Sequence, residues 1–182
     1  PADTGAVCVA LPQDVEGEAY DYPEYFFEKR VWYLDRRPIS TAQLDRAVAL
    51  IRSAKKPLLI CGGGVRYAEA GDALIRFAEA LNVPIAETQA GKSVVPWDHP
   101  LNVGGLGVTG GKAANVLAKD ADLILAVGTR LTDFTTSSKS AFKNPDARLL
   151  SINVCPFDAF KMDAGAIIAD AREALTALTA SL

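Results

Sequence analysis

The chain has 182 residues, of which 49% are hydrophobic and 23% are charged, values typical of one soluble globular domain with a buried core. Its formal net charge of −3 argues against nucleic acid or an acidic membrane as a partner, since both attract basic chains. No apolar run approaches the roughly 20 residues of a membrane helix. One histidine and three scattered cysteines predict neither a metal site nor a disulfide framework and, without a leader-like segment, favour the cytoplasm.

The first 37 residues do not follow the pattern of the rest of the chain. Residues 5–11 are apolar and predict a short buried strand that ends at Pro12. Residues 15–37 mix acidic and aromatic side chains without a helical or strand period. Because aromatic rings gain free energy when they are buried, we expect this linker to lie across a surface.

Helical and strand patterns alternate from Ser40 onward. Ser40 and Gln43 have the spacing of a capping box, in which each side chain satisfies a backbone N–H at the start of a helix. Asp170 and Glu173 repeat this spacing near the end of the chain. Apolar faces with helical period lie at 44–51, 74–81, 113–118 and 175–182.

Short apolar runs between these helices predict strands. They lie at 58–61, 83–86, 101–103, 123–127, 149–154 and 166–168. The runs are continuous rather than alternating, which is typical of strands that are covered on both faces. We therefore expect an α/β fold, Rossmann-like and doubly wound, with a mainly parallel sheet of about six strands and helices on both faces.

In such a sheet, ligands bind beyond the carboxyl ends of the strands, so the loops that follow strands carry the candidate sites. The candidate nucleotide-binding residues in these loops are Gly62, Gly63, Gly105, Gly107, Gly110, Gly128 and Arg130. Residues 105–110 match the pattern Gly-x-Gly-x-x-Gly, which can place N–H groups against a pyrophosphate. The strand before them is short and lies mid-chain, so a tight strand-to-helix turn is the simpler interpretation.

Polar side chains after the strand at 123–127 allow two interpretations each. Arg130 has the paired donors that hold a phosphate or carboxylate, but it could equally pair with Asp133 or cover a helix C-terminus. Asp133, Thr135 and Thr136 could contact a sugar or polyol at a substrate rim, or could cap a helix. The sequence contains no nucleophile elbow, acid pair or metal cluster. The residues alone therefore predict a domain for small-ligand binding or for interaction.

Several ordered segments resemble the thiamine-diphosphate-dependent enzymes. Residues 5–15 resemble the last strand of their pyrimidine-binding domain, and residues 47–65 resemble the opening of their central domain. The resemblance continues in order through 91–92, 98–101, 104–111, 121–123 and 128–130. It therefore covers nearly the whole chain.

Within this family, residues 87–92 and 133–138 are most similar to the trihydroxycyclohexane-1,2-dione hydrolases, which open a cyclic diketone in myo-inositol catabolism. The acetolactate synthases, whose central domain binds FAD, are the alternative. They typically carry Asp-Asp-Arg and Ile-Asp-x-Asp where this chain has residues 132–134 and 152–155. These differences make bound FAD possible but disfavoured.

The resemblance implies a division into the tail of a preceding domain at 1–14, an inter-domain linker at 15–37 and a central domain at 38–182. It also implies that the parent enzyme uses thiamine diphosphate and Mg²⁺, bound by its other two domains. This chain would then supply no catalytic or metal-binding residue and would be inactive alone.

The implied work of the central domain is to space its neighbours, to support a homo-oligomer and to lend loops to the active-site rim. Without those neighbours, the N-terminal strand and the linker are expected to be disordered or to attach to another copy. A stand-alone nucleotide-binding module, using the central glycine loop and Arg130, remains the alternative from a different class.

Overall fold

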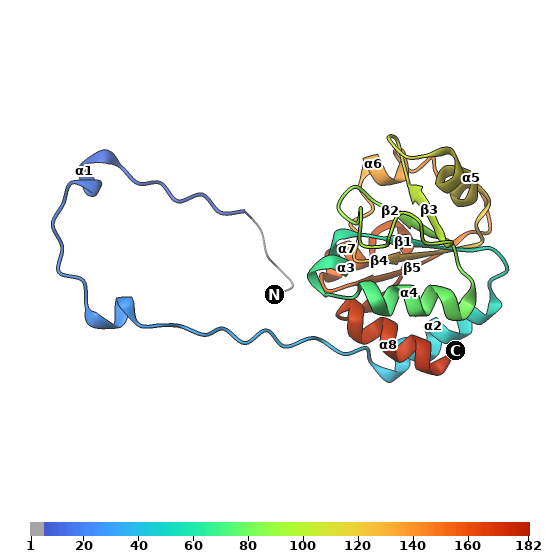
Figure 1. Cartoon of the computed structure of the whole chain (residues 1–182), viewed down its shortest axis with the longest axis horizontal. Coiled ribbons are helices and arrows are strands. Elements are labelled where there is room, and N and C mark those ends of the chain that lie inside the picture. The colour runs from blue at the N-terminus through green and yellow to red at the C-terminus, as the bar shows by residue number, and fades with distance from the viewer. Residues whose placement is uncertain (1–5) are drawn as a thin grey trace. The chain divides into compact units, whose positions relative to one another are not determined.

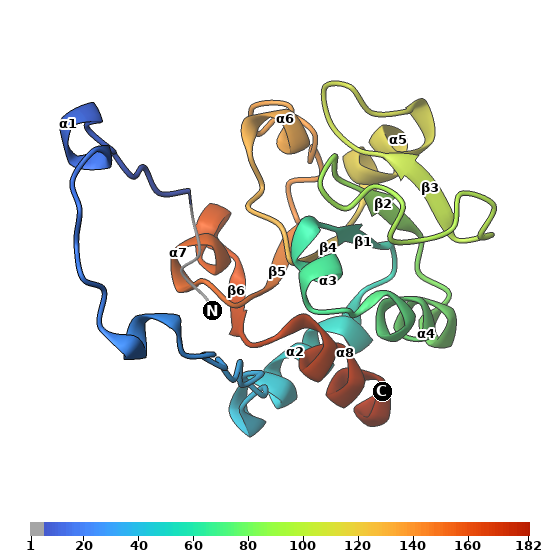
Figure 2. The same cartoon turned by 60° about the vertical axis from the view of Figure 1, so that its left-hand side comes forward.

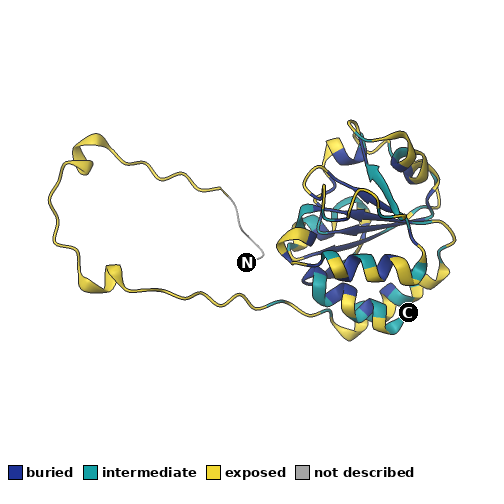
Figure 3. Ribbon diagram, in the orientation of Figure 1, coloured by how far each residue is buried: buried dark blue, intermediate teal, exposed yellow. Residues whose placement is uncertain are grey.

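The computed structural model describes residues 6–182. These residues fall into two compact units that divide between Asp35 and Arg36, 6–35 and 36–182. Figure 1 shows the whole chain with most of its helices and strands labelled. The first unit contains two short helical turns, α1 (Gln13–Glu16) and η1 (Glu24–Phe27). Every described residue of this unit is exposed (Figure 3).

The buried strand expected at residues 5–11 is not formed in residues 6–11, which belong to no helix or strand and are exposed. Gly5 lies outside the described residues. The prediction was wrong for 6–11 because an isolated strand has no neighbour to satisfy its backbone groups or to cover its side chains.

The aromatic residues of the first unit contact one another. The ring of Tyr22 lies 5.1 Å from the ring of Phe26 and 5.3 Å from that of Tyr20, measured between centroids. These rings are 56–72% exposed. The packing of this linker on a surface therefore stays a prediction.

The second unit is built on one six-stranded sheet in which all strands are parallel. The strands are β1 (Pro57–Cys61), β2 (Ile85–Glu87), β3 (Asn102–Gly105), β4 (Leu123–Val127), β5 (Arg148–Asn153) and β6 (Gly165–Ile168). Their order is β3-β2-β1-β4-β5-β6, with β3 and β6 at opposite ends (Figure 2). This arrangement confirms the doubly wound α/β fold that the sequence predicted.

Helices cover the two faces of the sheet. They are α2 (Thr41–Ser53), α3 (Gly63–Tyr67), α4 (Gly71–Leu81), α5 (Lys112–Asp120), α6 (Asp133–Thr136), α7 (Pro156–Ala159), η2 (Lys161–Asp163) and α8 (Ala171–Ser181). Helices α2, α4 and α8 lie on one face, and α5 and α6 lie on the other (Figure 1).

Alternate residues of each strand enter opposite halves of the core. In β4, Leu123 and Leu125 pack with the helices α2, α4 and α8, whereas Ile124 and Ala126 pack on the side of α5. Both sets are almost fully buried. This two-sided burial explains why the strands are continuous apolar runs in the sequence.

The two predicted capping boxes have different outcomes. At α2, the N–H of Gln43 donates to the Ser40 hydroxyl and the N–H of Ser40 donates to the Gln43 side chain, so the box is complete. At α8, Asp170 accepts the N–H groups of Arg172 and Glu173, but its own N–H donates to the Arg37 carbonyl at 2.8 Å. The reciprocal bond from Glu173 is absent because Arg37 has taken its donor.

The entry of the chain into the second unit is fixed at the same place. The Arg36 guanidinium donates to the carbonyl of Ala68 at 2.8 Å and to the carboxylate of Asp170 at 3.0 Å. Asp170 is buried at the start of α8. Its contacts with Arg36 and Arg37 therefore join the start of the second unit to the start of its last helix.

Candidate functional site

The point where the chain reverses its direction of winding lies between the neighbouring strands β1 and β4. In open α/β sheets, ligands bind outside the carboxyl ends of the strands at this point. Two of the predicted loops meet there, residues 62–64 after β1 and residues 128–130 after β4. The structure therefore brings Gly62, Gly63, Gly128 and Arg130 to one edge of the sheet.

These two glycine loops pack directly on each other. The N–H of Gly64 donates to the carbonyl of Gly128 at 2.8 Å, and the N–H of Gly62 donates to the carbonyl of Val127 at 2.9 Å. A Cβ atom on Gly64 would lie 2.6 Å from the Cα atom of Gly128. A Cβ atom on Gly62 would overlap the Gly128 carbonyl. Glycine is needed at both positions because two backbones touch there.

The loop after β2 covers the other side of the β1 loop. A Cβ atom on Gly91 would overlap the Cys61 carbonyl, and one on Gly63 would lie 3.0 Å from the Cβ of Ala90. The Cys61 thiol beneath them is buried, and this burial together with the nearby Glu87 carboxylate raises its pKa to about 12. The thiol is therefore protonated at neutral pH and is a poor nucleophile.

The glycine loop between β3 and α5 is a closed turn whose N–H groups have partners inside the protein. Gly107 has a φ of +100°, and a side chain there would overlap the Phe134 carbonyl. Asn115 of α5 accepts the N–H of Gly107 and donates to its carbonyl, both at 3.0 Å. Backbone N–H groups with internal acceptors belong to Leu106, Gly107, Val108, Gly110 and Gly111. These five donors of the glycine turn are therefore not directed at a pyrophosphate.

The polar residues after β4 lie in different environments. Arg130 is exposed, and its guanidinium makes no ion pair with Asp133 or any other described residue. Asp133 is exposed at the start of α6. Thr135 and Thr136 are buried, and the Thr136 hydroxyl donates to the Thr132 carbonyl at 3.1 Å. Of the predicted rim residues, Asp133 is the one on the surface.

Sequence reasoning missed a buried carboxylate at the same edge of the sheet. Glu87 ends β2 with a fully buried side chain. It accepts the N–H of Ser93 at 3.0 Å and the ammonium of Lys92 at 3.3 Å, so it holds the loop that follows it. The Lys92 side chain is 61% exposed, although its ammonium pairs with this buried carboxylate. The one sequence signal was an acidic residue directly after an apolar strand.

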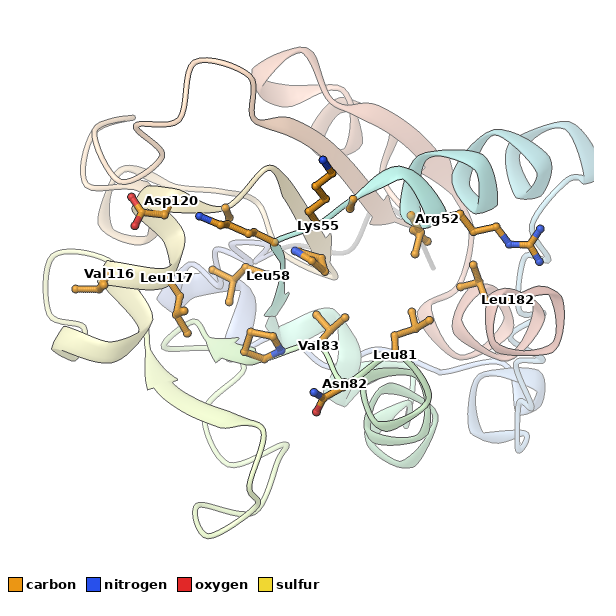
Figure 4. Close-up of a pocket in the computed structure, with 16 residues that line it drawn as sticks. Arg52, Lys55, Leu58, Leu81, Asn82, Val83, Val116, Leu117, Asp120 and Leu182 are labelled. Atoms are coloured by element: carbon orange, nitrogen blue, oxygen red, sulfur yellow. The ribbon is translucent and has the colours of Figure 1, made fainter.

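A groove with a volume of about 680 Å³ lies away from these loops, at the amino edge of the sheet (Figure 4).

Across residues 6–182, no three side chains of His, Cys, Asp or Glu are grouped closely enough to hold a metal ion. No helix in this described part is long and apolar enough to cross a membrane.

These features define a class: a parallel, doubly wound α/β domain whose switch point is closed by interlocked glycine loops. A sequence profile described as "Thiamine pyrophosphate enzyme, central domain" matches residues 44–178. The chain therefore belongs to the family of thiamine pyrophosphate enzyme central domains.

Two similar proteins from different genera carry the same name. The chain is 59% identical over 182 residues to the 3D-(3,5/4)-trihydroxycyclohexane-1,2-dione hydrolase of Clostridium perfringens strain ATCC 13124, covering 100% of this chain and 28% of that protein. It is 57% identical over 178 residues to the hydrolase of the same name from Bacillus cereus strain AH820, covering 98% of this chain and 28% of that protein. The chain thus spans about 28% of the length of these relatives.

A solved structure agrees with this assignment. The X-ray structure of a protein assigned as a thiamin diphosphate-dependent enzyme, from Mycobacterium smegmatis, matches with a TM-score of 0.69 and 27% identity. The match covers 83% of this chain and 30% of that one. Fold and family therefore agree between sequence and structure.

Proposed function

We propose that this chain is the central domain of a trihydroxycyclohexane-1,2-dione hydrolase, a thiamine-diphosphate-dependent enzyme that opens a cyclic diketone. The observation that carries the proposal is the identity of 59% along the whole chain to a protein of that name. The catalytic residues and the ligands of the cofactor and Mg²⁺ then belong to the parts of the parent enzyme outside these 182 residues. A cytoplasmic location and a homo-oligomeric parent are parts of the same proposal.

Within the parent, the work of this domain is structural. The interlocked loops at residues 62–64, 91 and 128 make one edge of the sheet rigid, and Glu87 fixes the loop that carries Lys92. Rigid elements hold a binding site in place more accurately than mobile loops do. The exposed side chains at this edge, Lys92 and Asp133 among them, are the ones available to an active-site rim.

The alternative is an acetolactate synthase central domain that binds FAD. Five N–H groups of the glycine turn, those of Leu106, Gly107, Val108, Gly110 and Gly111, have internal acceptors. This speaks against a dinucleotide there, because a pyrophosphate needs donors that point outward. A stand-alone nucleotide-binding module is disfavoured for the same reason.

The test begins with the parent enzyme, purified with thiamine diphosphate and Mg²⁺. We expect hydrolysis of 3D-(3,5/4)-trihydroxycyclohexane-1,2-dione and no formation of acetolactate from pyruvate. Acetolactate formation without diketone hydrolysis would overturn the proposal.

The isolated 182-residue chain provides the second test, a thermal-shift titration with FAD and with ADP as the control. A ligand that binds the native state raises the melting temperature, so we expect no shift with either compound. Stabilisation by FAD alone would support the acetolactate synthase alternative, and stabilisation by both would support a nucleotide-binding module.

A further inference from the structure

A groove at the amino edge of the sheet is not used by any of the loops described above. It lies where β1, β2 and β4 begin, between the C-terminal ends of α2, α4 and α5 and Leu182 (Figure 4). Its volume of about 680 Å³ falls within the range of roughly 300–1,000 Å³ that is usual for small-molecule sites. All of its lining belongs to the second unit.

The floor of the groove is apolar. Ile51, Leu58 and Val83 form part of it and are buried below the surface of the groove. Val116 and Leu117 of α5 continue this apolar lining toward solvent and are 51% and 39% exposed. Such a floor offers no partner for the hydroxyl groups of a ribose or sugar, so it favours a ligand with an apolar body.

The rim of the groove is basic. Arg52, Lys55 and Lys56 line it together with one acidic residue, Asp120. Arg52 donates one N–H to the carbonyl of Ser181 at 3.1 Å and keeps its charge and its other donors, so all three basic groups are available to a ligand. Neither lysine ammonium has an ion-pair partner in the part of the chain that the structure describes.

The backbone beneath the two lysines is held in place. The N–H groups of Lys55 and Lys56 donate to the Asp122 carboxylate at 2.7 and 2.9 Å. Helix C-termini add partial negative charge at this edge, which offsets part of the charge of the lysines. The affinity of a ligand must therefore come mainly from its apolar body, and the lysines select the sign of its polar end.

We propose that this groove binds a small amphipathic anion. The aliphatic or aromatic body of the ligand lies on the floor around Leu58 and Val83. Its single carboxylate or sulfonate lies at the basic rim that Arg52, Lys55 and Lys56 form. This site is separate from the carboxyl-edge loops and does not depend on which reaction the parent enzyme performs.

The test uses the 182-residue chain and three probes, anilinonaphthalene sulfonate, decanoate and decanol. The sulfonate reports binding by fluorescence, decanoate competes with it, and decanol has the apolar body of decanoate without its charge. Amide chemical shifts in nuclear magnetic resonance spectra locate the bound probe. The variant Lys55→Glu/Lys56→Glu reverses the rim charge, and Lys139→Glu/Lys143→Glu, outside the groove, is the control with the same change in net charge.

We expect decanoate to shift the amides of Leu58, Val83 and Leu117 and to displace the sulfonate. Reversal of the rim charge should weaken decanoate binding by about tenfold or more, whereas the control variant should bind as the unchanged chain does. Decanol should bind about tenfold more weakly than decanoate. This pattern supports the proposal.

Three results would each overturn it. Equal binding of decanol and decanoate would show that charge is not recognised. Shifts confined to residues outside the groove would place the probe elsewhere, for example on the exposed aromatic rings of the first unit. A dimer in light scattering that dissociates on Lys55→Glu/Lys56→Glu would show that a second copy covers the groove instead.

Discussion

Three glycines around the loop between β3 and α5 allow the packing argument to be tested quantitatively. Gly107 has a φ of +100° and no room for a Cβ atom, Gly104 has a φ of +87° and open space, and Gly111 has a φ of −78° and open space. Alanine at Gly107 therefore adds both backbone strain and atomic overlap, alanine at Gly104 adds strain alone, and alanine at Gly111 adds neither. Because all three positions belong to one loop region, their losses of stability can be compared directly.

The expected losses of stability follow from these geometries. Gly111→Ala should cost at most about 1 kcal/mol, because Gly111 is the N-cap of α5 and alanine is a poorer N-cap than glycine. Gly104→Ala should cost about 1–2 kcal/mol, the cost of left-handed backbone for an alanine. Gly107→Ala should cost about 1–2 kcal/mol more, because the overlap with the Phe134 carbonyl breaks the hydrogen bond from Val108.

Urea unfolding followed by circular dichroism measures all three variants. If the glycines serve packing, the free energy of unfolding without any ligand should be lowest for Gly107→Ala, intermediate for Gly104→Ala and highest for Gly111→Ala. Equal stability of the Gly107→Ala and Gly111→Ala variants would refute the argument, since the overlap would then cost nothing.

Three other predictions concern individual side chains. Cys61 should resist a thiol reagent in the native chain while exposed Cys8 reacts, and because its folded pKa of about 12 exceeds the ordinary 9.0, its contribution to stability should be lost as pH rises above 9. Ser40→Ala should cost about 1 kcal/mol and Asp170→Ala about 2–3 kcal/mol in urea unfolding, because Asp170 also pairs with Arg36. Burial acts to raise the pKa of Asp122, but N–H donors outweigh it and lower that pKa, so acid titration of Asp122→Asn should show less loss of stability than the unchanged chain below about pH 4.

The central strands were predictable because burial alone determines them. The runs at 58–61 and 123–127 are apolar throughout, and the structure places both as neighbouring strands at the centre of the sheet. The same kind of run at 6–11 forms no strand. An apolar pattern shows that a segment can be buried, but it does not show whether the partner that would bury it is present.

The candidate site was less predictable because it depends on contacts across the fold. A glycine pattern does not distinguish a phosphate-binding loop from two loops in contact. At Gly107 the distinction rests on Asn115, which accepts the N–H of Gly107, and on the Phe134 carbonyl, which leaves no room for a side chain. Glu87 was missed because a carboxylate after a strand resembles an ordinary loop residue until its burial is known. The amino-edge groove is formed by the ends of separate elements and has no sequence signal.

The contacts of Asp170 have a practical consequence for anyone who expresses this domain by itself. The family resemblance places the boundary at residue 38, but the ion pair from Arg36 and the carbonyl of Arg37 both lie before it. A chain trimmed to residue 38 would leave a buried carboxylate without its cation, which is a costly loss in a protein interior. The shortest stable version of the domain should therefore begin no later than Arg36.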